Sequence, residues 1–109
     1  RAEMCDLEDQ ERLAAAVRDS DILINATKVG MKPMDGDTLI PAELLHPGLI
    51  VADTVYNPLE TRLLREAKEA GCQVIGGIGM LLWQGAAAFQ LFTGREMPVK
   101  EVEERFFAE

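Results

Sequence analysis

Apolar residues follow two patterns that alternate along this 109-residue chain. Short, nearly continuous apolar runs are typical of strands buried on both faces, and they predict strands at 21–25, 49–53 and 72–75. Elsewhere apolar residues recur at helical spacing, which predicts helical segments. These segments lie at 7–19, 41–45, 59–70, 80–92 and 99–107. Strands that alternate with helices pair in parallel through right-handed crossovers. We therefore expect an α/β protein with a partial doubly wound (Rossmann-like) parallel sheet, flanking helices and a C-terminal helical pair.

Glycine and proline mark the predicted boundaries. Gly71 stands where a helix commonly ends on a left-handed residue, and Pro98 opens the last helix. Residues 76–79, Gly-Gly-Ile-Gly, are predicted to form a turn before the long apolar helix. The stretch 70–94 has no charged residue, but this turn leaves an apolar helix shorter than the roughly 20 residues that span a membrane. We therefore expect no membrane contact.

The charge balance excludes one class of partner. The chain has 19 acidic and 11 basic residues, a net charge of -8, and no lysine or arginine cluster longer than two. Nucleic acid binding needs a concentrated basic surface, so we expect no nucleic acid partner. A small anionic cofactor remains compatible with this charge, because backbone N–H groups and one or two lysines suffice to hold it.

The two cysteines, Cys5 and Cys72, lie far apart and have no metal-ligand spacing around them, so we expect no metal site. Reduced thiols are typical of a cytoplasmic protein, and the first residues contain no apolar signal segment. No first structural element precedes the acidic helix, so the sequence is expected to begin inside a larger protein.

The most unusual residues follow the three predicted strands. In open α/β sheets, ligands bind beyond the carboxyl ends of the strands. Each of the three segments there combines small residues, which allow close backbone approach, with side chains that form hydrogen bonds. The segments are Asn-Ala-Thr-Lys-Val-Gly-Met at 25–31, Asp-Thr-Val-Tyr-Asn-Pro-Leu-Glu-Thr at 53–61, and Gly-Gly-Ile-Gly-Met-Leu-Leu-Trp-Gln at 76–84.

These segments resemble three blocks of the shikimate dehydrogenase family, in the family's order and approximate spacing. The blocks read Asn-Ala-Thr-x-x-Gly-Met, Asp-x-x-Tyr-Asn-Pro-x-x-Thr and Gly-x-x-Met-Leu-x-x-Gln, and the resemblance covers about 21–94. The residues at 27–33 and 81–85 resemble the bifunctional quinate/shikimate branch of the family more than the strictly shikimate branch.

The resemblance implies an oxidoreductase that transfers a hydride between NADP or NAD and shikimate/3-dehydroshikimate or quinate/3-dehydroquinate, in the shikimate pathway of aromatic amino acid biosynthesis. It places residues 1–77 in the C-terminal part of an NAD(P)-binding Rossmann domain. Residues 78–109 would be helices that pack back toward a substrate domain. In the family, the acid/base pair lies in that other domain and the glycine-rich phosphate loop opens the cofactor domain. We therefore expect no catalytic residue in this chain and no activity from it alone.

The resemblance also assigns site residues. Those implied to bind the cofactor are Asn25, Thr27, Lys28, Thr54, Val55, Tyr56, Asn57, Gly77 and Met80. Tyr56 and Gln84 are implied to contact the substrate.

Structural roles remain open beside these assignments. Asn25 and Thr27 would cap the strand end. Lys28 would be an ordinary surface lysine. Asn57 would form a turn. Tyr56 would have a packing role. Gln84 would form a structural hydrogen bond through a buried amide.

Two other residues at the strand ends need a separate interpretation. Asp53 is interpreted as structural, fixing the Tyr-Asn-Pro turn. Gly77-Ile78-Gly79 follows a strand, but Leu82 stands where a dinucleotide fingerprint needs its third glycine. By resemblance this turn instead approaches the nicotinamide ring, where a side chain at Gly77 would block the cofactor. Gly76 replaces the aspartate that the family commonly has there.

The helix at 80–92 is apolar almost all round and needs cover on every side. A three-stranded sheet covers only part of it, so we expect an exposed apolar patch and self-association through this helix. An alternative function is a non-catalytic nucleotide-binding or interaction module built on a shortened Rossmann sheet.

Overall fold

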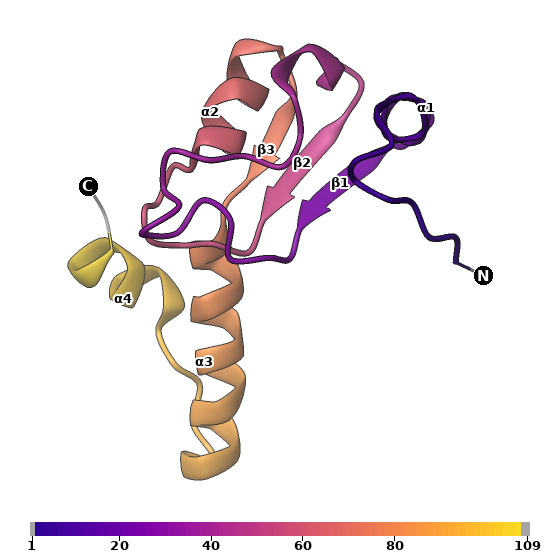
Figure 1. Ribbon diagram of the computed structural model, residues 1–109. Coiled ribbons are helices and arrows are strands. Elements are labelled where there is room, and N and C mark those ends of the chain that lie inside the picture. Colours follow the sequence, from indigo (N-terminus) through magenta and orange to yellow (C-terminus); the bar gives the residue numbers. More distant parts are fainter. Residues whose placement is uncertain (1, 108–109) are drawn as a thin grey trace.

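The computed structural model describes residues 2–107 and contains the predicted alternation of strands and helices (Figure 1). Its elements in chain order are α1 (Gln10–Arg18), β1 (Ile22–Asn25), the 3-10 helix η1 (Ala42–Leu44), β2 (Ile50–Asp53), α2 (Arg62–Glu69), β3 (Gln73–Ile75), α3 (Gly77–Thr93) and α4 (Val99–Phe106). No helix among these residues is long and apolar enough to cross a membrane.

The sheet has three parallel strands in the order β1-β2-β3. Leu23 of β1 pairs with Val51 of β2, which pairs with Val74 of β3. This arrangement confirms the predicted α/β fold with a partial parallel sheet.

Side chains at the helix ends explain where α1 and α2 begin and end. The side chain of Asp9 accepts a hydrogen bond from the N–H of Arg12 at the start of α1. Thr61 caps α2 in the same way through the N–H of Leu64, so α2 begins at Arg62 and not at residue 59 as the apolar spacing predicted. Gly71 has the positive φ of 85° expected for the residue that ends this helix.

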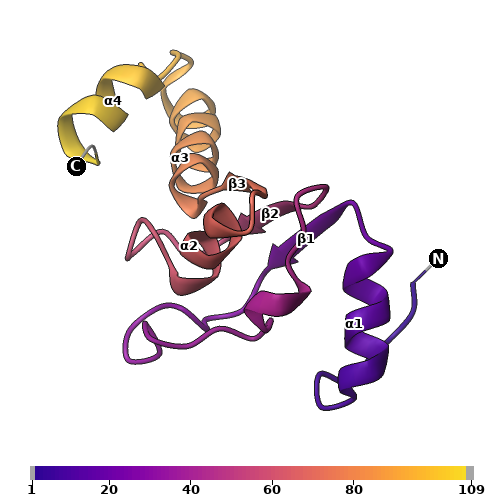
Figure 2. The same ribbon diagram turned by 90° about the horizontal axis from the view of Figure 1, so that it is seen from above.

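One face of the sheet forms the hydrophobic core. Alternate strand residues point into it, and α1, α2 and the segment from 40 to 49 all contribute buried side chains. Figure 2 shows α1 and α2 on the same side of the three strands. The core residues are Leu13, Val17, Ile40, Leu45, Leu49, Val51, Leu63, Leu64, Ala67 and Cys72.

The other face of the sheet is open among residues 2–107. Ile22, Ile24 and Ile75 are 57%, 60% and 54% exposed on it. The prediction that the strands are buried on both faces is therefore wrong for the described residues. A continuous apolar run indicates that side chains on both faces of the strand favour burial. Here, however, the two helices that pack on the sheet lie on the same face.

The structure also corrects the glycine turn predicted at 76–79. Gly76 is extended, and Gly77 is already the first residue of the 17-residue α3. Glycine weakens a helix but does not forbid one. The turn signal was therefore misleading, and the strand passes into the helix within a single residue.

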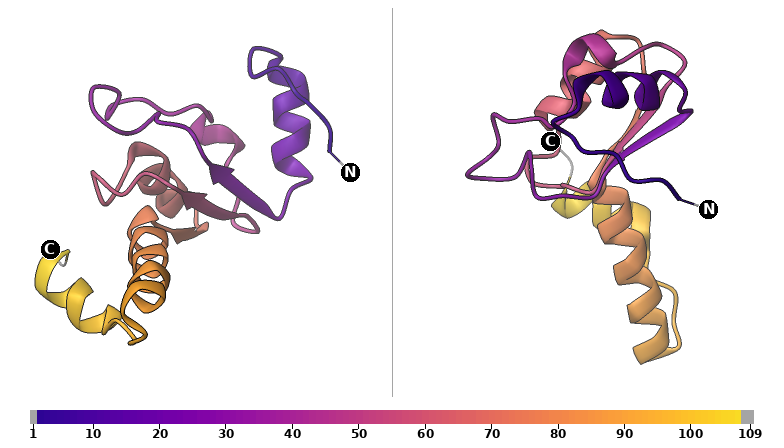
Figure 3. Two further views of the ribbon diagram at one scale, coloured as in Figure 1. Left: turned by 90° about the horizontal axis from the view of Figure 1, so that it is seen from below. Right: turned by 45° about the vertical axis from the view of Figure 1, so that its right-hand side comes forward.

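Helix α3 projects away from the sheet, with α4 folded back beside it (Figures 1 and 3). The radius of gyration is 16.0 Å, against about 13 Å for a compact domain of about 100 residues. Much of the apolar surface of α3 is exposed, as predicted. Its exposed large side chains are Met80, Trp83, Phe89, Leu91 and Phe92.

Candidate functional site

The three segments singled out in the sequence meet at the carboxyl edge of the sheet. The loop after β1, the loop after β2 and the first turn of α3 lie together there (Figure 1). This is the edge at which open parallel sheets bind ligands. The structure therefore brings together side chains that are far apart in the sequence.

Asp53, the last residue of β2, organises this edge. Its side chain is 3% exposed. Oδ1 accepts a hydrogen bond from the backbone N–H of Val55 at 2.9 Å, and Oδ2 accepts one from the hydroxyl of Thr61 at 2.7 Å. These bonds close the turn that contains Tyr56, which confirms the predicted structural role of Asp53.

Asn25, the last residue of β1, uses its whole amide group within the protein. Its Nδ2 donates to the carbonyl of Val29 at 2.9 Å and to Oδ1 of Asp53 at 3.1 Å. Its Oδ1 accepts from the N–H and the hydroxyl of Thr27 at 3.2 and 2.6 Å. An amide side chain has two donors and one oxygen with two lone pairs, so all are occupied. The side chains of Asn25 and Thr27 thus cap the strand end in this structure, and the backbone remains as the group that can meet a ligand.

Lys28, Tyr56 and Asn57 are exposed at the rim of this edge. Lys28 forms no ion pair with another described residue, and the phenol of Tyr56, which is 43% exposed, forms no hydrogen bond within residues 2–107. Val55, the residue before Tyr56, is buried. The rim therefore offers an ammonium group and a phenol to a ligand.

Gly77 brings the start of α3 against the loop after β2. A Cβ atom at this position would lie 2.5 Å from the carbonyl oxygens of both Thr54 and Val55. No side chain fits at that distance, so glycine is required by the backbone packing itself. The sequence analysis explained this glycine by a clash between a side chain and the bound cofactor. The contact with the loop is an additional reason.

Gln84 lies seven residues after Gly77, which is about two helical turns and roughly 10 Å along the axis on nearly the same face of α3. Its Nε2 donates to the carbonyl of Leu81 in its own helix at 2.9 Å. The side chain is exposed, and so is Met80. The expectation that Gln84 is buried is therefore wrong for residues 2–107, because none of them covers this part of α3.

Comparison with known proteins agrees with the resemblance noted in the sequence. A model of the "Shikimate 5'-dehydrogenase C-terminal domain" matches residues 77–105. The chain is 52% identical to a shikimate dehydrogenase (NADP(+)) of Listeria monocytogenes, over 98% of this chain and 37% of that protein. It is also 52% identical to a quinate/shikimate dehydrogenase of Shigella flexneri, over 91% of this chain and 40% of that protein. The chain belongs to the shikimate dehydrogenase family.

Solved structures of shikimate and quinate dehydrogenases share the fold. A crystal structure of shikimate 5-dehydrogenase from Listeria monocytogenes, in complex with shikimate and NAD, has a TM-score of 0.92 and covers 98% of this chain and 37% of that one. Quinate dehydrogenase from Corynebacterium glutamicum in complex with NAD has a TM-score of 0.83 at 34% identity, covering 94% and 35% of the two chains. The chain thus spans little more than a third of the shikimate and quinate dehydrogenases that it matches.

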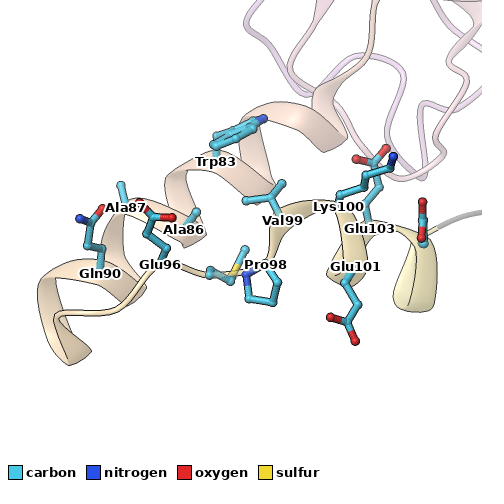
Figure 4. A pocket seen from close by; sticks show the side chains of 12 residues that line it. Trp83, Ala86, Ala87, Gln90, Glu96, Pro98, Val99, Lys100, Glu101 and Glu103 are labelled. Atoms are coloured by element: carbon cyan, nitrogen blue, oxygen red, sulfur yellow. The ribbon is translucent and has the colours of Figure 1, made fainter.

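A broad groove among the described residues lies away from the strand ends. A groove of about 1010 Å³ runs between α3 and α4 (Figure 4), and its α3 side is formed by Trp83, Ala86, Ala87 and Gln90. These residues lie on a different face of α3 from Gly77 and Gln84. None of the predicted site residues lines this groove.

A smaller hollow of about 250 Å³ lies at the end of β1 and is mostly apolar. Asn25, Ala26 and Thr27 contribute to its wall, together with Leu23 and Leu39. Thr27 and Val29 line it, whereas Lys28 between them in the sequence does not.

Sequence reasoning missed two residues that hold the site together. Thr61 both caps α2 and bonds Asp53, and a threonine just before a helical pattern is a recognised capping signal. Arg62 donates from its guanidinium to the carbonyl of Gly36 at 3.0 Å, which ties the loop after β1 to α2. No local signal in the sequence indicated that second contact.

Titratable groups offer little further chemistry at this edge. No group of three or more potential metal ligands occurs within residues 2–107. Burial raises the pKa of the Cys72 thiol, while a backbone hydrogen bond at His46 lowers it to a smaller extent. Cys72 directly precedes β3, so it lies near the amino edge of the sheet, away from the strand ends that form the site.

Proposed function

We propose that this chain supplies the C-terminal part of the cofactor domain of an enzyme that transfers a hydride between NAD(P) and shikimate/3-dehydroshikimate or quinate/3-dehydroquinate. The observation that carries the proposal is the convergence of segments 25–31, 53–61 and 76–84 at the carboxyl edge of one parallel sheet. The solved relatives that match the chain were crystallised with shikimate and NAD, or with NAD.

The residues at this edge suit a dinucleotide. Lys28 is an exposed ammonium group that pairs with no described carboxylate, so it is available for a phosphate or ribose. The bound nicotinamide would supply the hydride acceptor. We assign the cofactor contacts to Asn25, Thr27, Lys28, Thr54, Val55, Tyr56, Asn57, Gly77 and Met80, with Asn25 and Thr27 acting through their backbone groups.

We assign Tyr56 and Gln84 to the substrate. A phenol and an amide donate and accept hydrogen bonds, as the ring hydroxyls and carboxylate of a cyclic polyol acid require. Tyr56 stands beside the backbone that Gly77 approaches, and Gln84 lies on the same side of α3 as Gly77. A substrate held between them would face the cofactor segments.

The acid/base pair belongs, in this proposal, to the remainder of the longer protein. The buried carboxylate of Asp53 is fully engaged by hydrogen bonds, so it has no role in proton transfer. We place residues 1–77 in the cofactor domain and residues 78–109 in helices that pack toward the substrate domain. The parent protein is assigned to the cytoplasm, in keeping with the free thiols of Cys5 and Cys72.

The test compares the full-length protein with the 109-residue chain in NAD- and NADP-linked oxidation of shikimate and of quinate. Turnover by the full-length protein and none by the isolated chain is the expected result. Tyr56→Phe and Gln84→Ala should each lower kcat/KM by roughly tenfold to a hundredfold, because a buried polar partner on the substrate is left unpaired. Gln90→Ala, on another face of the same helix, is the matched control.

Other outcomes have definite meanings. Turnover by the isolated chain would overturn the assignment of the acid/base pair to the remainder of the protein. A full-length protein that binds the nucleotide but oxidises neither substrate would favour the alternative of a non-catalytic nucleotide-binding module.

A further inference from the structure

The carboxylate of Asp53 links β1 to two points of the segment 53–61. It accepts hydrogen bonds from Asn25 at the end of β1, from Val55 in the loop after β2, and from Thr61 at the start of α2. The donor–acceptor distances are 3.1, 2.9 and 2.7 Å. A carboxylate buried to this extent is costly unless it is hydrogen-bonded, and here both oxygens are engaged. No buried side-chain polar atom among the described residues lacks a partner.

The backbone that Asp53 holds is also held from its other side. The carbonyl oxygens of Thr54 and Val55 approach the α carbon of Gly77 so closely that no side chain would fit there. The N–H of Val55 points at the Asp53 carboxylate. The peptide units before Tyr56 are therefore fixed between β2 and the first turn of α3, and the exposed phenol extends from a rigid base.

We propose that Asp53 is a positioning residue that fixes the cofactor loop at 25–29 relative to the substrate-facing loop at 54–56. This inference rests on the proposed function. Asp53 is buried and its oxygens are occupied, so it acts through the Val55 N–H and the Asn25 amide. Rigid support of this kind preserves reacting geometry, and small displacements of a site lower activity steeply.

The test uses the full-length protein that contains this chain. Asp53→Ala removes all three acceptor contacts and should raise KM for both the nucleotide and the polyol acid, lowering kcat/KM by roughly tenfold to a hundredfold. Asp53→Asn retains an oxygen for Val55 and Asn25 and places its NH₂ group against the Thr61 hydroxyl, so it should recover most of that loss. Asp21→Ala, an exposed carboxylate at the opposite end of β1, is the matched control.

A purely structural role predicts a different result. In that case Asp53→Ala would lower kcat only in proportion to the folded fraction, measured by circular dichroism, and both KM values would stay at the wild-type level. That outcome would overturn the proposal. If Asp53→Ala fails to fold, Asn25→Ala carries the test, because it breaks the bridge to Asp53 and otherwise removes only bonds of Asn25 to Thr27 and Val29 inside the cofactor loop. The KM for the polyol acid should then rise although Asn25 lies in the cofactor loop, and an unchanged value would count against the proposal.

Hydrogen exchange separates this inference from the proposed function. Asp53→Ala, or Asn25→Ala in its place, should speed amide exchange in 25–29 and 54–56 while β2 stays protected, whether or not the wild-type protein oxidises either substrate. Wild-type turnover together with unaltered exchange and unaltered KM values would leave the proposed function standing and reject the positioning role. Absence of wild-type turnover would reject the proposed function, and loop exchange would still decide whether Asp53 fixes the loops.

Discussion

At the scale of single residues, the site depends on close contacts that leave no room for substitution. Gly77 is the clearest case, because its α carbon faces two backbone carbonyls that cannot move independently. Backbone is less compliant than the end of a side chain, so a methyl group there displaces either α3 or the loop that carries Tyr56. The same residue therefore links the packing of α3 to the geometry of the proposed substrate site.

Gly77→Ala is expected to lower the free energy of unfolding of the 109-residue chain by about 1–3 kcal/mol, the usual cost of overpacking. Urea denaturation followed by circular dichroism measures this change. Gly85→Ala is the matched control, since a Cβ there meets nothing within 4 Å. It should raise the free energy of unfolding by about 0.5–1 kcal/mol through helix propensity. Equal effects of the two substitutions would contradict the steric explanation.

At the scale of elements, short polar contacts determine where helices begin and how the loops attach to them. Thr61 ends the loop after β2, caps α2 and bonds Asp53, and it is only 1% exposed. Arg62, the next residue, holds the loop after β1 through Gly36. The start of α2 is thus the anchor for both loops of the site.

Thr61→Val keeps the shape of this side chain and removes its hydroxyl. We expect a loss of about 1–3 kcal/mol in the free energy of unfolding, because the helix loses its cap and Asp53 loses a donor. Thr61→Ser restores both hydrogen bonds and should recover most of that loss in the same denaturation assay. A Thr61→Val protein as stable as the wild type would show that the cap contributes little here.

At the scale of the whole molecule, the described residues leave two apolar surfaces uncovered. One is the sheet face with Ile22, Ile24 and Ile75, and the other is the projecting helix α3. Leu91 and Phe92 near the end of α3 are 87% and 89% exposed. Apolar surfaces of this kind commonly mark sites of association.

We therefore propose that the 109-residue chain self-associates through α3. Light scattering should show a mass that increases with protein concentration. The double substitution Leu91→Gln/Phe92→Gln should shift the protein toward the monomer, because it removes the most exposed apolar side chains of the helix. Leu7→Gln, outside α3, provides a control with a half-exposed leucine. A wild-type chain that stays monomeric at high concentration would contradict the proposal.

From the sequence alone we could predict the order of the elements, the parallel sheet and the three segments of the candidate site. These features follow from local patterns: apolar runs predict strands, helical spacing predicts helices, and the chemistry after each strand predicts a ligand site. The structural role of Asp53 was also readable, because an aspartate before a turn commonly bonds the backbone two residues on.

Local patterns did not indicate which face of the sheet is covered or which side chains contact one another, because both depend on the tertiary fold. Asn25 and Asp53 are 28 residues apart in sequence, and they become neighbours because two parallel strands end at the same level. The steric need for Gly77 arises in the same way, from the position of α3 against the loop after β2. The spacing of apolar residues along the chain indicates whether each side chain favours a buried or an exposed environment. Contacts across the sheet depend on how the crossovers place whole elements, and that information is not local.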